Sequence, residues 1–109
     1  MSTSQPSNYR LPSIKTIENA MKLAILEDRP ILMDYWVPSL EKKAVVGVRK
    51  LSEDEIVDPK ITTEKLLVKS EEEYTSPIFK TFKSDKEFII KTQNSIYIVD
   101  SEIPGKTIS

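Results

Sequence analysis

Hydrophobic residues near the start of the chain recur at the spacing of an α-helix. The stripe that they form consists of Ile14, Ile17, Met21 and Ile25. Ser13 precedes the first of them and is a residue type that caps helix N-termini. Pro30 ends the pattern because proline disfavours helical backbone at the residue before it and lacks an N–H donor. We therefore predict a helix over residues 13–27.

After Pro30 the pattern changes to alternating or continuous apolar residues that are rich in β-branched and aromatic types. This pattern is typical of strands, which we predict over residues 31–37, 43–50, 64–69, 78–83, 87–92 and 95–100. The acidic stretch 51–63, which contains a proline, is expected to be a loop. Gln93 and Asn94 are predicted to form a tight hairpin turn, because Asn tolerates the positive φ that such a turn demands.

The order of one helix followed by short strands predicts an α+β fold that is mainly β. Consecutive strands with short connections pair antiparallel, and closure removes exposed sheet edges. We therefore expect a five- to six-stranded antiparallel small barrel or strongly curled sheet, with the helix over one opening. The expected organisation is a disordered polar tail (1–12), a single helix-plus-barrel domain (13–103) and a C-terminal tail (104–109). This architecture is similar to that of SH3-like and Sm-like small barrels.

The composition excludes several kinds of chemistry. The 109 residues include no Cys and no His, so a disulfide framework, a thiol nucleophile and an imidazole base are all excluded. No calcium-binding loop pattern is present, and we expect neither a metal nor another cofactor. The net charge of -1 lacks the basic excess of a domain that binds nucleic acid by charge alone.

Membrane insertion is not expected from the sequence. The longest apolar run, Ala44–Val48, is far shorter than the ~20 residues that cross a bilayer. The first ten residues contain no apolar region of the kind found in secretory signals. The expected location is the cytoplasm.

Four aromatic residues are candidates for contact with a protein partner. They are Tyr35, Trp36, Tyr74 and Phe79. Tyr35 and Trp36 lie together in an apolar segment, and small barrels use such pairs to grip peptides or bases. The alternative is that Trp36 fills one end of the hydrophobic core.

Four lysines on the predicted hairpin of residues 78–92 are candidates for contact with nucleic acid. They are Lys80, Lys83, Lys86 and Lys91, with Phe79 and Tyr97 among them. Proteins that bind single strands combine lysines that contact phosphates with rings that stack on bases. Alternating lysines also occur on ordinary solvated strands, where they oppose aggregation.

Asp34 interrupts the apolar segment 31–37 and is the one candidate for a catalytic acid. A carboxylate beside an apolar wall has a raised pKa, as general acids do, whereas an outward Asp would be ordinary. Carboxylate chemistry would require Asp34 and Asp100 to converge. We therefore predict a protein that is not an enzyme and has no catalytic residue.

Two segments resemble a known sequence pattern. Tyr74–Phe79 (YTSPIF) and Lys91–Val99 (KTQNSIYIV) are similar to the T-S-P-I … T-x-N-S-x-Y pattern of small uncharacterised β proteins of bacteria, phages and large DNA viruses. The resemblance covers about a third of the chain. It implies a β fold and a viral accessory or structural protein, located in the host cytoplasm or the virion. It implies no particular activity.

The sequence thus favours a non-enzymatic interaction module. Such a module would bind a protein partner or associate with itself as a homo-oligomer, because a rigid β scaffold offers both grooves and free strand edges. The alternative is a small barrel that binds nucleic acid through the lysine and aromatic hairpin.

Overall fold

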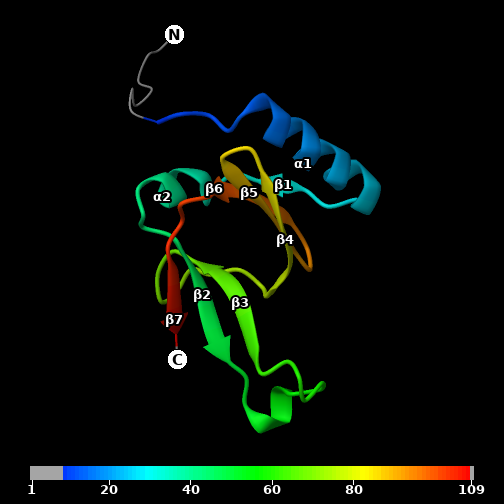
Figure 1. Ribbon diagram of the computed structural model, residues 1–109, viewed down its shortest axis with the longest axis vertical. Coiled ribbons are helices and arrows are strands. Elements are labelled where there is room, and N and C mark those ends of the chain that lie inside the picture. Colours follow the sequence, from blue (N-terminus) through cyan, green and yellow to red (C-terminus); the bar gives the residue numbers. More distant parts are fainter. Residues whose placement is uncertain (1–8, 109) are drawn as a thin grey trace.

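The computed structural model describes residues 9–108, which form two helical segments, a 3-10 turn and seven strands (Figure 1). The predicted α+β, mainly β class is confirmed. Residues 1–8, the larger part of the predicted N-terminal tail, lie outside the described residues. The elements are α1 (Ile14–Glu27), β1 (Ile31–Leu32), α2 (Trp36–Leu40), β2 (Val45–Lys50), η1 (Glu53–Glu55), β3 (Thr63–Val68), β4 (Ile78–Ser84), β5 (Glu87–Thr92), β6 (Ile96–Asp100) and β7 (Gly105–Ile108).

Helix α1 begins and ends where the sequence predicts. The Ser13 side chain caps it by accepting a hydrogen bond of 3.2 Å from the Thr16 backbone N–H. At the other end Asp28 adopts left-handed backbone with φ of 54°, and its N–H donates to the Ala24 carbonyl. Pro30 follows and prevents a further turn.

The prediction of one strand over residues 31–37 is wrong. Only β1 is extended, and residues 36–40 form the short helix α2. Pro38 lies in the first turn of α2, where proline is tolerated because an N–H there has no partner within the helix. Pro38, which follows the predicted strand in the sequence, is therefore part of a helix.

The seven strands form two sheets, and the expected single closed barrel is not seen among the described residues. A four-stranded sheet has the order β1-β6-β5-β4, and a three-stranded sheet has the order β3-β2-β7. Two pairs, β1 with β6 and β2 with β7, are parallel, whereas the prediction had only antiparallel neighbours. Figure 1 shows the three-stranded sheet extending away from the helices, with η1 at its far end.

The C-terminal segment contributes a strand. Residues 104–109 were expected to be a tail, but β7 pairs with β2 from Val46↔Gly105 to Arg49↔Ile108. The Val46 N–H also donates to the Pro104 carbonyl at 2.9 Å. This strand completes the three-stranded sheet.

The predicted hairpin of β5 and β6 is confirmed, but its turn differs from the prediction. The strands are antiparallel with Ile90 opposite Tyr97. Neither Gln93 nor Asn94 has a positive φ, and the turn is closed by a hydrogen bond from the Thr92 N–H to the Ser95 carbonyl at 2.9 Å. Hydrogen bonds within the Thr92–Ser95 segment therefore replace the expected left-handed residue.

Two hydrophobic clusters lie on opposite faces of the four-stranded sheet. One cluster joins this sheet to the helices and includes Ala20, Trp36, Ile89 and Ile98. The other joins it to the three-stranded sheet and includes Tyr35, Leu67, Ile90, Tyr97 and Val99. Strand β6 is buried on both faces because it lies between these clusters. The face of the three-stranded sheet that points away from this second cluster carries the candidate site.

Candidate binding groove

This face of the three-stranded sheet carries alternate residues of β2, β3 and β7. Val45, Gly47 and Arg49 lie directly opposite Val68, Leu66 and Glu64 in the register of β2 with β3. Lys106 and Ile108 of β7 lie beside Gly47 and Arg49 on the other side. Since successive residues of a strand point to opposite faces, these side chains share one surface. The opposite face buries Leu67, with Val46 packed beside it, against the four-stranded sheet.

A groove of about 1020 Å³ lies over this face. Its floor is largely apolar and consists of Val45, Leu66, Val68 and Ile108, and the segment from Tyr74 to Pro77 forms part of its wall. Gly47 has no side chain, and a Cβ there would lie 3.0 Å from Ile108 Cδ1 and 3.1 Å from Val68 Cγ2. Glycine therefore lets the side chains of Ile108 and Val68 approach each other across the central strand.

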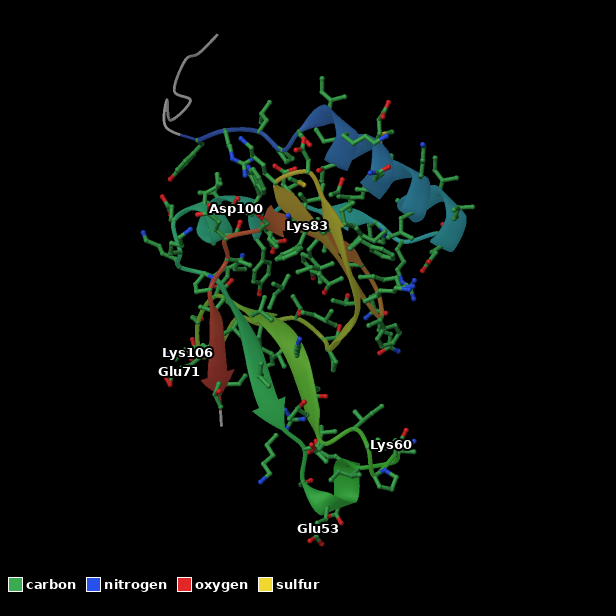
Figure 2. The ribbon with its side chains drawn as sticks, in the orientation of Figure 1. Glu53, Lys60, Glu71, Lys83, Asp100 and Lys106 are labelled. Atoms are coloured by element: carbon green, nitrogen blue, oxygen red, sulfur yellow. The ribbon has the colours of Figure 1, made fainter. Side chains whose placement is uncertain are left out.

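The charged groups of the groove differ in whether they are neutralised. Arg49 pairs with Glu64 and with Glu55, and its hydrogen bonds, followed by those of Ser52, lower the pKa of Glu55 to about 2. Lys106 makes no ion pair within residues 9–108. Figure 2 shows Lys106 with Glu71 at the β7 side of the sheet, far from Glu53 at its tip. Lys106 and Glu71 thus both line the groove without forming an ion pair among the described residues.

Two of the four aromatic candidates are exposed, and only one of these lines the groove. The Tyr74 side chain is 61% exposed and the Phe79 side chain is 60% exposed. Tyr74 lines the groove at the point where its backbone bridges to Val68 of β3. Phe79 lies on β4, outside the groove lining. The pair therefore offers a test residue and a matched control.

The other two aromatic candidates are buried in the core. Tyr35 contacts Tyr97 edge-on, with ring centroids 5.4 Å apart, and burial first, then Asp34, raises its pKa to about 12. The Trp36 indole N–H donates to the Arg10 carbonyl at 2.8 Å, and the Arg10 guanidinium lies 4.9 Å from its ring centre. Neither ring is placed on the surface for a partner.

The structure disperses the residues of the predicted nucleic-acid surface. Lys80 lies over Phe82, which packs toward the helices. Lys83 lies opposite Phe88 in the pairing of β4 with β5, and Phe88 packs toward the three-stranded sheet. Lys91 forms an ion pair of 3.0 Å with Glu27 at the end of α1. Lys86 lies in the turn between β4 and β5, and Tyr97 is buried. No single face gathers these lysines around an exposed ring.

The carboxylates suggested for catalysis have separate partners. Asp34 pairs with Lys69 at 3.3 Å, and its side chain is 57% exposed. Asp100 instead pairs with Arg10 at 2.6 Å, at the start of the chain described. The ion pair between Arg10 and Glu87 joins the same network. Within residues 9–108 these acids are therefore parts of ion pairs, and no group of three acidic side chains is arranged to hold a metal ion.

Most of the groove residues and the buried Glu87 do not stand out in the sequence. The alternation of Val45, Gly47 and Arg49 predicts a strand, and the glycine between valines is a sign of close packing above it. The lining by Lys106 and Ile108 follows from the parallel pairing of β7, which no local pattern predicts.

Within the part of the chain that the structure describes, neither helix is long and apolar enough to span a bilayer.

Comparisons with protein-family models, with curated proteins and with solved structures found no match to this chain.

Proposed function

We propose that this chain is a non-enzymatic interaction module that binds an extended, apolar segment of a protein partner in the groove of the three-stranded sheet. The observation that carries the proposal is the largely apolar floor of the groove, on which Val45, Val68 and Ile108 are partly exposed. A groove of about 1020 Å³ is larger than most sites for small metabolites and accommodates several residues of an extended chain. The site requires one open sheet and not a closed barrel.

The chemistry of the groove supports binding and not catalysis. The chain has no His or Cys, and Arg49 in the groove is neutralised by two carboxylates. Tyr74 supplies a large exposed ring, and tyrosine is one of the residue types enriched among strong contributors to partner affinity. Lys106 would pair with a carboxylate of the bound segment.

The experiment is selection of peptides from a random library displayed on phage, followed by calorimetric titration of the selected peptides. We expect Tyr74→Ala to weaken binding by about tenfold, because tyrosine is enriched among the interface residues whose truncation costs more than about 1 kcal/mol. Lys106→Glu should lower the affinity for acidic peptides and leave the affinity for neutral peptides unchanged. Phe79→Ala, which removes an equally exposed ring outside the groove, is the control and should leave affinity unchanged. Equal effects of the two ring variants would contradict the proposal.

Binding of nucleic acid, the alternative expectation, has weaker support. Lys91 is held by Glu27, Tyr97 is buried, and Lys80 and Lys83 belong to opposite faces of β4. Titration with single-stranded DNA at increasing salt separates the two functions. Affinity that falls steeply with salt and is lost in Lys80→Glu or Lys83→Glu would favour nucleic acid over the peptide groove.

A further inference from the structure

Helix α1 presents its main apolar stripe to solvent. The helix packs on the four-stranded sheet through Thr16 and Ala20, which have no exposed surface. The four stripe residues are exposed instead: Ile14 by 79%, Ile17 by 37%, Met21 by 53% and Ile25 by 77%. A second apolar face is available on the helix and has no cover within residues 9–108.

The size of this face is that of an interface. The four exposed side chains form one apolar patch, and patches of several hundred Å² on a monomer often mark functional surfaces. A standard interface buries about 800 Å² per partner, of which somewhat more than half is apolar. The stripe is therefore suited to form the apolar centre of such an interface.

The charges beside the stripe are self-complementary. Glu18 and Lys22 lie on the same flank of the stripe, one turn apart, and both are exposed. Neither makes an ion pair among the residues described. In two antiparallel helices related by a two-fold axis, equal flanks face each other. A two-fold axis that passes near residue 20 thus places Glu18 of each copy opposite Lys22 of the other copy. The dimer would contain two such pairs.

We propose that α1 is the interface of a two-fold symmetric homodimer in which the α1 helices of two copies pack antiparallel through Ile14, Ile17, Met21 and Ile25. The same axis places Ile14 opposite Ile25 of the partner copy and Met21 near the centre. The buried face of α1 points away from the stripe, so the bodies of the two copies lie on the outer sides of the helix pair. The groove of the three-stranded sheet is a separate surface, and the dimer does not depend on it.

Sedimentation velocity over micromolar to millimolar protein concentrations tests the proposal. We expect a species of twice the 12.5 kDa chain mass. Met21→Glu should raise the dimer dissociation constant by at least about a hundredfold, because the interface would then bury two unpaired carboxylates. Val57→Glu is the control, since Val57 is 96% exposed and lies between η1 and β3. Far-UV circular dichroism checks that both variants fold.

A charge reversal tests the pairing itself. Glu18→Lys alone and Lys22→Glu alone each place like charges opposite each other and should weaken the dimer, whereas the double variant should restore it. A double variant weaker than both single variants would contradict the antiparallel register.

Engineered thiols test the direction of the helices, because the chain has no cysteine of its own. The pair Ile14→Cys with Ile25→Cys should form a covalent dimer on mild oxidation, since these positions lie too far apart on one helix for an internal disulfide. Efficient cross-linking by Ile14→Cys alone would indicate parallel helices and overturn the proposal. A chain that stays monomeric at all concentrations would also overturn it, because another partner or another segment must then cover the stripe.

Discussion

Arg10 forms an ion pair with Glu87 across 77 positions of the chain, and the Glu87 side chain has no exposed surface. Asp100, labelled in Figure 2, lies opposite Glu87 in the register of β5 with β6 and accepts from the same guanidinium. The hydroxyls of Thr16 and Ser13 lie 2.6 and 3.1 Å from Glu87 Oε1. The network therefore ties the segment before α1 and the first turn of α1 to the end of the four-stranded sheet.

We expect Arg10→Met to lower the free energy of unfolding by about 2 kcal/mol. Removing one partner of a buried pair leaves the other charge without compensation, and the cost is below the usual 3–5 kcal/mol because Arg10 is partly exposed. Urea denaturation followed by circular dichroism measures the change. Arg49→Met is the control. Its partners Glu55 and Glu64 remain in contact with water, so leaving them unpaired should lower the free energy of unfolding by less. An equal loss in both variants would argue against burial as the cause.

The ionisation of Glu87 should make the stability of the protein depend on pH in the acidic range. Burial raises its pKa, but hydrogen bonds from Thr16, Arg10 and Ser13 outweigh burial and hold the pKa below its ordinary value of 4.5. A carboxyl whose pKa is lowered by folding stabilises the protein fully above about pH 4.5, and this contribution is lost as pH falls through the folded pKa. Glu87→Gln should therefore be less stable than the wild type at pH 7, and the difference should shrink below pH 4.5.

Urea midpoints measured from pH 7 downward for both proteins give this comparison. A difference that is independent of pH would mean that the substitution acts through packing and that the charge of Glu87 contributes nothing.

Local patterns predicted the regular elements well. The N-terminal cap of α1, the bounds of β5 and the pairing of β5 with β6 follow from residue types within a few positions of one another. The prediction of a strand over residues 31–37 was wrong because β-branched and aromatic residues can also pack into a core when they lie on a short helix. Trp36 and Val37 of α2 pack in this way, against the cluster beneath α1.

Long-range pairings were not predictable from such patterns. The groove depends on β7, whose parallel pairing with β2 joins residues about 60 positions apart, and its four residues carry no strong strand pattern. The buried ion pair of Arg10 with Glu87 is equally non-local. Helical periodicity located the stripe of α1, but it does not state which side of an amphipathic helix meets the body of the same chain.

The ionisation of Tyr35 should make the stability of the protein depend on pH in the alkaline range. Burial, followed by the nearby Asp34, raises its pKa from 10.0 to about 12. A phenol whose pKa is raised by folding stabilises the protein below about pH 10, and this contribution is lost as pH rises through 12. Tyr35→Phe should therefore lose less stability than the wild type between pH 9 and pH 12, as measured by urea midpoints. Tyr74→Phe changes an exposed ring and is the control, which should follow the wild type.

Leu67 tests whether the two sheets unfold as one unit. Its side chain has no exposed surface and lies in the cluster between the sheets, so Leu67→Ala should cost about 3 kcal/mol through lost burial and a residual cavity. Trp36 is the one tryptophan of the chain and lies in the other cluster, beneath the helices. Its fluorescence therefore reports on a region that Leu67 does not belong to. We expect tryptophan fluorescence and circular dichroism to shift to lower urea together in Leu67→Ala, because a single cooperative unit loses stability everywhere.

Ile61→Ala, at an exposed position before β3, should leave both signals unchanged. A Leu67→Ala protein whose circular dichroism changes at low urea while Trp36 fluorescence keeps the wild-type midpoint would show instead that the three-stranded sheet unfolds separately. In that case the groove would belong to a less stable unit, and β6, which is buried between both clusters, would remain folded with the helices.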